Sequence, residues 1–328
     1  MNKFTDNKLS APFYIEGVLA GNISVLSRAI TIIESTLSEH SKLASEIIEA
    51  ILPNSGKSFR LGITGVPGVG KSTFIESFGK ELLDKKHKIA VLAIDPSSSK
   101  SKGSILGDKT RMDFLSAQPN VFIRPTPSSG SLGGVAKATY ETILLCEAAG
   151  FDFIIIETVG VGQSEIAVSK MTDFFLLLML AGAGDELQGI KRGIMEMADS
   201  IAITKADGDN AQKAKVAKME YTNAIHLFPA TESGWVPKVE ICSSVTNTGI
   251  SEIYTLINSY KNYAVSNNYF LKKRKQQQLE LIRDTINHQI IKRYYHTHHL
   301  AEKLKKLEIQ DVLNPYQEAF KLLKELGL

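Results

Sequence analysis

The spacing of apolar residues changes twice along the chain and predicts three parts. In residues 1–57 the period is helical: Leu26, Ile30, Ile33 and Leu37 are spaced by four, three and four residues after a capping residue, Asn22. Residues 58–265 alternate helical stretches with short apolar runs at 59–64, 89–95, 151–158, 174–180, 200–205 and 236–243. Residues 266–328 are helical again. We therefore expect an N-terminal helical segment, a central domain and a C-terminal helical arm.

The short apolar runs of the central domain predict its fold class. Runs without polar alternation are typical of strands buried on both faces, and the periodic stretches between them supply the covering helices. We predict an α/β domain with a mostly parallel sheet and helices on both faces, flanked by helical extensions. The C-terminal arm is basic and amphipathic, with apolar seams at Leu279, Ile282, Ile286 and Ile290 and at Leu300, Leu304 and Leu307.

Composition narrows the class of protein. The 328 residues are 43% hydrophobic, enough for a sizeable core, and a net charge of +3 argues for neither a nucleic-acid nor a membrane partner. The longest apolar run, 174–181, is far shorter than the roughly 20 residues of a spanning helix. Two distant cysteines in apolar stretches predict buried thiols, and the polar start predicts no signal or transit peptide. The cytoplasm is the expected compartment.

A glycine-rich loop carries the strongest chemical signal. It follows a predicted strand and opens a predicted helix, the context that a phosphate-binding loop requires. Its residues are Gly65, Val66, Pro67, Gly68, Val69, Gly70, Lys71, Ser72 and Thr73. Glycines let backbone N–H groups approach phosphate oxygens, and the helix N-terminus favours anions. We expect Lys71 to contact the β- and γ-phosphates and Ser72 to ligate Mg²⁺.

A second motif indicates which base is bound. Thr204 and Lys205 end the predicted strand 200–205, and Asp207 follows it. A carboxylate at Asp207 can accept from the N1–H and the N2 amino group of guanine, whereas adenine offers an acceptor at N1 and no amino group at C2. An unpaired buried carboxylate costs about 1–3 kcal/mol or more, so guanine is favoured. The alternative is that Asp207 caps the helix that follows it.

A further loop is a weaker candidate for the same base. Ser243, Ser244 and Val245 lie where the predicted strand 236–243 ends. Their backbone N–H groups could meet the guanine O6 atom. Taken alone, this loop would not identify a nucleotide site.

Three acidic residues are candidates for the metal and for the attacking water. Asp95 and Glu157 close predicted strands, and Asp108 follows a polar loop. A carboxylate at a strand end beside the phosphate loop can hold Mg²⁺ directly or through water, so these three join Ser72 as expected ligands. Lys71, Glu157 and Asp95 are the expected catalytic residues. The alternative for each acid is a solvated charge at a strand end.

With these residues identified, the sequence resembles the methylmalonyl-CoA mutase-associated GTPases, the MeaB/ArgK family of P-loop GTPases. The likeness covers residues 22–260. It includes the motifs GVPGVGKST at 65–73, AIDPSSSKSKGSILGDKTRM at 93–112, PSSGSLGGVAKAT at 127–139, ETVGVGQSE at 157–165 and AGAGDELQGIKRGIMEMAD at 181–199. The family's usual pattern has Asn where Thr204 stands and Pro where Ala181 stands.

The resemblance implies a homodimeric, Mg²⁺-dependent GTPase that binds GTP and GDP. It also implies a chaperone that docks on an adenosylcobalamin-dependent acyl-CoA mutase, gates cofactor loading and protects or reactivates the enzyme. Residues 96–112, 158–165 and 182–191 would be its three switches. On this basis residues 58–265 are the GTPase domain, and residues 266–328 are the arm expected to form the dimer.

Other functions remain open from the sequence. A nickel-inserting GTPase of the same superfamily would be expected to have Cys or His ligands near the switches, where neither cysteine lies. A kinase or transport ATPase could use the same phosphate loop, but Asp207 argues against adenine. A non-catalytic scaffold would bind GTP without hydrolysing it. His288, His296, His298 and His299 in the arm fit a solvated helix face better than a metal site.

Overall fold

The computed structural model describes residues 10–35, 37–95, 112–127, 132–158, 164–182, 192–297, 300–307 and 314–325. The chain forms two compact units, residues 1–277 and 278–328. The three-part division at residues 57 and 265 stays a prediction.

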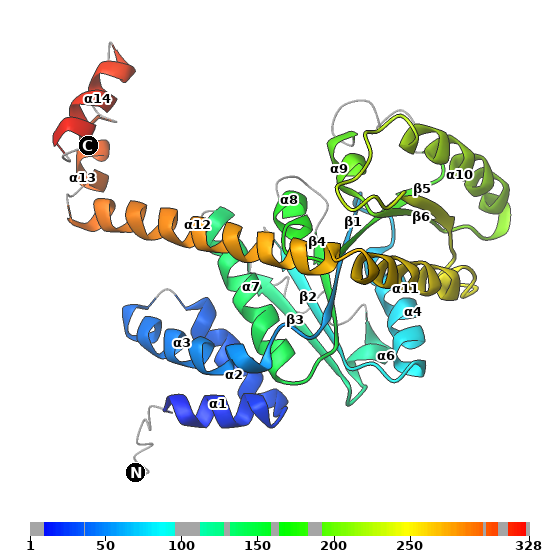
Figure 1. Cartoon of the computed structure of the whole chain (residues 1–328), viewed down its shortest axis with the longest axis horizontal. Helices are drawn as coiled ribbons and strands as arrows, with labels where there is room; N and C mark the ends of the chain where they lie inside the picture. The colour runs from blue at the N-terminus through cyan, green and yellow to red at the C-terminus, as the bar shows by residue number, and fades with distance from the viewer. Residues whose placement is uncertain are drawn as a thin grey trace. The chain divides into compact units, whose positions relative to one another are not determined.

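A seven-stranded sheet forms the centre of the first unit in the described residues (Figure 1). Its strands are β1 (Phe59–Gly65), β2 (Ile89–Asp95), β3 (Val121–Pro127), β4 (Phe153–Thr158), β5 (Phe174–Leu180), β6 (Ser200–Thr204) and β7 (Lys238–Ile241). The order across the sheet is β3-β2-β4-β1-β5-β6-β7, and every neighbouring pair is parallel. The predicted parallel sheet is confirmed.

Helices cover both faces of this sheet, as predicted. On one face lie α4 (Lys71–Asp84), α6 (Asp113–Ser116) and α11 (Ile250–Ser266), which share a core with alternate residues of the strands. The other helices of the domain are α7 (Leu132–Ala148), α8 (Ser164–Ser169), α9 (Arg192–Met197) and α10 (Ala211–Ile225). Of these, α9 and α10 pack on the opposite face of β5 and β6. Every residue of β1 and β4 is buried, as expected for strands covered on both sides.

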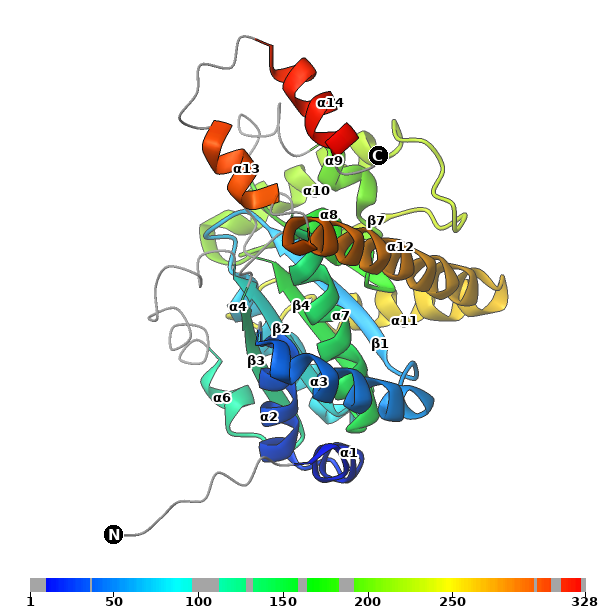
Figure 2. The same cartoon turned by 90° about the vertical axis from the view of Figure 1, so that its left-hand side faces the viewer.

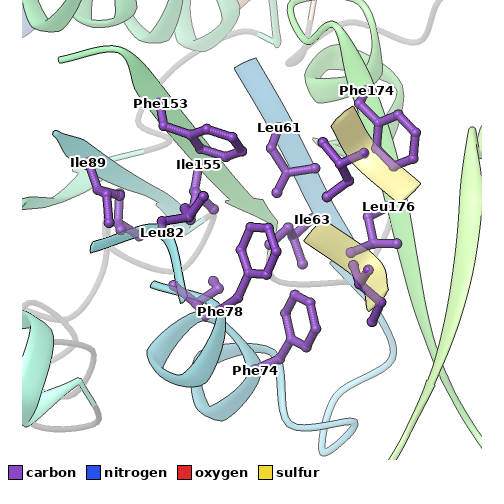
Figure 3. Close-up of a cluster of buried hydrophobic side chains, with 14 of the residues drawn as sticks. Leu61, Ile63, Phe74, Phe78, Leu82, Ile89, Phe153, Ile155, Phe174 and Leu176 are labelled. Carbon is purple, nitrogen blue, oxygen red and sulfur yellow. The ribbon is translucent and has the colours of Figure 1, made fainter. Parts of the chain in front are cut away.

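Packing of α4 against the sheet fixes both ends of the phosphate loop. Phe74 and Phe78 stack with ring centroids 5.5 Å apart, and both are fully buried. Figure 3 shows their rings turned toward Leu61 and Ile63 of β1, with Phe153 of β4 beside Phe78. Because the loop joins β1 to α4, this contact holds both of its ends.

The sequence did not predict β3, an edge strand of the sheet. Its residues include Pro125 and Pro127, which lack an N–H donor, and Arg124 in place of an apolar side chain. Proline is tolerated at a sheet edge because one side of the strand needs no ladder partner. The strand therefore forms through its pairing with β2 rather than through an apolar run of its own.

Three N-terminal helices pack beside α7 (Figure 2). They are α1 (Ala11–Leu19), α2 (Ile23–Glu34) and α3 (Ser38–Ile51), followed by the short η1 (Leu52–Asn54). The predicted cap is confirmed, since the Asn22 side chain accepts from the N–H groups of Ser24 and Val25 at 3.0 and 3.2 Å. Leu37 does not continue the α2 seam; it precedes α3 and is half exposed.

A buried charge cluster anchors the start of α12 (Tyr269–Thr297) to the first unit. Arg274 donates from Nε and Nη2 to the two carboxylate oxygens of Asp173, at 2.6 and 2.7 Å. Arg60 makes the matching pair of bonds to Glu147, at 2.9 and 3.0 Å. Burial alone would raise the pKa of Glu147, but the Arg60 guanidinium and the Ser58 hydroxyl lower it below its ordinary value.

The second unit contains the rest of α12, then α13 (Leu300–Leu307) and α14 (Pro315–Glu325). Lys303 of α13 pairs with Glu325 of α14 at 2.7 Å. The predicted seam along α12 is half exposed, at Leu279, Ile282, Ile286 and Ile290. Among the helices that the structure describes, none has the length and apolar character needed to cross a membrane.

The core predicts a large cost for truncating Phe78. Phe78→Ala should lower the free energy of unfolding by about 3–5 kcal/mol, because the ring is fully buried and its removal leaves a cavity. Phe320→Ala is the matched control, since Phe320 is 69% exposed and should change stability by less than about 0.5 kcal/mol. Urea unfolding of both variants measures this; equal losses would contradict the packing described here.

Candidate functional site

The phosphate loop lies at the carboxyl end of β1, between β4 and β5. β1 ends at Gly65 and α4 begins at Lys71, the strand–loop–helix order that the sequence predicts. A Cβ at Gly65 would stand 2.6 Å from the carbonyl oxygen of Leu178 in β5, so only glycine lets the loop approach this strand. Gly68 and Gly70 have φ of 79° and 94°, a region that other residues rarely adopt.

Lys71 lies inside this loop. Its Nζ donates to the carbonyl oxygens of Gly65 and Val66, at 2.8 and 3.3 Å. Burial lowers the pKa of Lys71, while the negative charges of Glu157 and Glu165 act in the opposite direction. Phosphate oxygens could take the place of the two carbonyl oxygens, so the amine is positioned for the role that the sequence predicts.

Two of the predicted metal ligands are adjacent. Ser72 donates from Oγ to Glu157 Oε1 at 3.3 Å, and Glu157 lies in β4 opposite Ile63 of β1. Asp95 ends β2, the strand on the other side of β4, but its side chain is outside the described part of the structure. Asp108 is outside the described residues altogether, as are residues 96–111, 159–163 and 183–191 of the predicted switches.

The described side chains do not by themselves form a complete metal cage. Within the described ranges, no group of three or more His, Cys, Asp or Glu side chains could hold an ion. Mg²⁺ at a nucleotide site needs few protein ligands, because phosphate oxygens and water complete its octahedron. The Ser72–Glu157 pair is therefore compatible with such a site. His288, His296, His298 and His299 have no described side-chain placement.

On the base side, Asp207 and Ser243 come together. Ser243 Oγ donates a short hydrogen bond to Asp207 Oδ2 and accepts from the N–H of Thr246 at 3.2 Å. Asp207 precedes the short η3 (Gly208–Asn210), yet its side chain makes no capping hydrogen bond there. One carboxylate oxygen is thus held by a neighbouring loop, which fixes the orientation of the carboxylate.

The rest of the Ser243 loop is partly positioned by α4. Ser77 of α4 donates from Oγ to the carbonyl oxygen of Ser244 at 3.1 Å, while Val245 is 83% exposed. The Cys242 thiol before the loop is buried, and burial raises its pKa to about 12. The thiol therefore remains protonated at neutral pH, consistent with the predicted buried cysteine.

Side chains on the base side donate to backbone carbonyl oxygens of the phosphate loop and so join the two sides. Lys205 donates from Nζ to the carbonyl oxygen of Gly68 at 2.8 Å, and its own φ of 55° lies in the left-handed region. Thr204 donates from Oγ1 to the carbonyl oxygen of Val69, 135 residues earlier in the chain, at 2.7 Å. The two distant sequence motifs form one connected site at the carboxyl ends of β1 and β6.

Sequence reasoning gave no individual role to two residues of this region. Glu165, the first described side chain of α8, is buried and interacts electrostatically with Lys71. Ser77 lies two turns into α4 and fixes the Ser244 loop. Neither residue belongs to the loop motif itself, and only the folded arrangement of α8 and of the Ser244 loop brings them to the site.

Comparison with protein families identifies this arrangement. Residues 26–299 match the family described as methylmalonyl-CoA mutase-associated GTPase MeaB. The chain belongs to this family. It is therefore a GTPase with GTP as its nucleotide, and the predicted resemblance is confirmed.

Individual relatives match over most of their length. The GTPase ArgK of Escherichia coli is 45% identical, covering 86% of this chain and 88% of its own. The mouse protein named methylmalonic aciduria type A homolog, mitochondrial, is 42% identical over 94% of this chain and 77% of its own. A crystal structure described as a LAO/AO transport system kinase is 33% identical, with a TM-score of 0.77 and coverage of 100% of this chain and 99% of that one.

Proposed function

We propose that this MeaB-family GTPase is Mg²⁺-dependent and serves as a chaperone for an adenosylcobalamin-dependent acyl-CoA mutase, methylmalonyl-CoA mutase first among the candidates. In this role it gates cofactor loading and protects or reactivates the mutase. The observation that carries the proposal is the connected site, in which the phosphate loop and the Asp207 carboxylate share one framework, in a family described as mutase-associated.

The site residues divide into three groups by role. Lys71 and the loop N–H groups neutralise and position the phosphates as charge develops on them. Ser72 and Glu157, with Asp95 and Asp108, would hold Mg²⁺ directly or through water. The guanine is held by Asp207, with Lys205, Ser243, Ser244 and Val245 beside it, and Thr204 belongs to the same nucleotide-binding motif. Water attacks the γ-phosphorus, the bond to the bridging oxygen breaks, and GDP and phosphate leave.

The ends of β4 and β5, the strands on either side of β1, suggest how the nucleotide state could be transmitted. Thr158, the last residue of β4, donates from its hydroxyl to that of Thr64 at 2.8 Å, next to Gly65. β5 ends at Leu180, and Gly182 after it has a φ of 78°. Residues 159–163 and 183–191 follow these points directly. We infer that both segments respond to the γ-phosphate and that the second relays the response to the mutase.

The arm supports the proposed homodimer. In α12 the side chains of Leu279, Ile282, Ile286 and Ile290 recur at three- and four-residue spacing and are about half exposed. An apolar seam of this period is suited to packing against another helix. A second copy of the chain would supply the same seam.

A kinase function is the second candidate, because the solved relative carries that description. Kinases and GTPases can share the phosphate loop, so the loop does not separate them. The Ser243-held Asp207 favours guanine, and most phosphoryl donors of kinases are adenine nucleotides. Transfer of the γ-phosphate to an acceptor other than water would support the kinase alternative.

Base choice should depend on Asp207. Asp207→Asn should weaken GTP binding by about tenfold or more and favour xanthosine triphosphate, because the new amide can donate to the C2 carbonyl of xanthine. Asp209→Asn is the matched control, an exposed carboxylate two residues away that should leave the preference unchanged. Equilibrium titration with both nucleotides measures this. An unchanged preference in Asp207→Asn would remove Asp207 from the base site.

Coupling to the mutase should depend on residues 183–191. Lys191→Glu should reduce the stimulation of GTP turnover by a cobalamin mutase while leaving GTP affinity nearly unchanged, because a relay acts through the difference between two states. Lys57→Glu, an exposed charge reversal just before β1, is the control. Turnover is measured with and without methylmalonyl-CoA mutase. If the mutase stimulated GTP turnover equally in Lys191→Glu and Lys57→Glu, this relay would be excluded. No stimulation of the wild type would count against methylmalonyl-CoA mutase as the partner.

A further inference from the structure

Thr204, a residue of the proposed base-reading motif, makes its described hydrogen bonds to other parts of the chain. Its side chain is buried, with 3% exposure, and its hydroxyl points to main-chain carbonyls of two other elements. Oγ1 lies 2.7 Å from Val69 O in the phosphate loop and 3.3 Å from Met179 O in β5. A hydroxyl has one hydrogen to donate, so the shorter bond to Val69 is the stronger candidate. The group is thereby committed to the protein framework and not to a base.

The acceptor in this bond controls the direction of a loop N–H group. In a trans peptide the C=O and N–H groups point in opposite directions and move as one rigid plane. Fixing Val69 O toward β6 therefore turns the Gly70 N–H away from β6. Gly70 directly precedes Lys71 at the start of α4, where N–H groups bind phosphate.

Burial distinguishes this bond from a neighbouring contact that also joins the end of β6 to the phosphate loop. Lys205 Nζ also donates to the phosphate loop, at Gly68 O, but Lys205 is exposed and its long side chain can exchange this bond for water. Water has no comparable access to the Thr204 hydroxyl. Loss of that hydroxyl would leave a buried carbonyl without its donor, which is costly.

We propose that Thr204 is a positioning residue that sets the phosphate loop from the end of β6, and that it contributes to nucleotide affinity through the phosphates and not through the base. This inference rests on the proposed nucleotide site. It also accounts for Thr at this position, where the family's usual pattern has Asn. The Thr204 hydroxyl donates the hydrogen bond that links β6 to the phosphate loop.

The expected signature is a loss of affinity that depends on the phosphates but not on the base. Thr204→Val removes the hydroxyl at nearly constant shape and should weaken GDP and IDP by the same factor, roughly tenfold. IDP lacks the guanine N2 amino group, so it tests the base. GMP lacks the β-phosphate that the loop binds and should lose much less than GDP. Thr204→Ser retains the donor and should restore binding to near the wild-type level.

The measurement is competitive displacement of a fluorescent GDP analogue from the full-length chain by GDP, IDP and GMP. Thr172→Val is the matched control, because Thr172 is also buried and donates to a backbone carbonyl, Val168 O, at 3.0 Å. It lies at the amino end of β5, whereas the phosphate loop lies at the carboxyl ends of the parallel strands. It should lose stability without losing nucleotide affinity. Should Thr204→Val fail to fold in thermal melts, Thr204→Ala compared with Thr204→Ser makes the same test.

Three outcomes would overturn the inference. If GDP and IDP were weakened by different factors, or GMP as much as GDP, Thr204 would act on the base or on the whole site. Wild-type GDP affinity in Thr204→Val would remove the positioning role. Asp207→Asn, tested in the same assay, separates failure of this inference from failure of the proposed base site. If Asp207→Asn alters the base preference and Thr204→Val has no effect, this inference alone is rejected. If Asp207→Asn leaves the base preference unaltered, the proposed base site is rejected.

Discussion

The close approach of the phosphate loop to β5 is the constraint on which the site depends. At Gly65 there is no room for a Cβ beside Leu178 O, and from there the chain must turn through Gly68 and Gly70 into α4. Buried aromatic side chains of α4, including Phe78, hold this helix on the sheet. Backbone freedom at the glycines and rigid packing on both sides of the loop together produce a preformed anion site.

The base side is built onto this loop by hydrogen bonds from neighbouring elements. Thr204 and Lys205 contact the loop carbonyls, Ser243 orients Asp207, and Ser77 of α4 fixes the loop that follows Ser243. A change in the position of the phosphates would therefore shift the residues on the base side, and a change in the position of the base would shift the phosphate loop. Such coupling fits the proposed role, in which a partner responds to the nucleotide state.

The local motifs were predictable because each depends on residue type and spacing. The phosphate loop needs its glycines and Lys71 in one short stretch, and the buried strands need continuous apolar runs, so the parallel sheet followed as well. β3 was missed because its prolines and Arg124 are tolerated only at an edge, a property of the sheet and not of the segment. The interaction of Glu165 with Lys71 was not predicted, because it depends on the placement of α8.

The most direct test of the account is single-turnover hydrolysis of GTP and of ATP by the wild-type chain, with Mg²⁺ and with excess chelator. Lys71→Ala serves as the negative control, because it removes the positive charge that the loop directs at the phosphates. The account predicts GTP cleavage that requires Mg²⁺ and Lys71, with ATP cleaved far more slowly. Equal cleavage of both nucleotides, or GTP cleavage that survives the loss of Lys71, would contradict it.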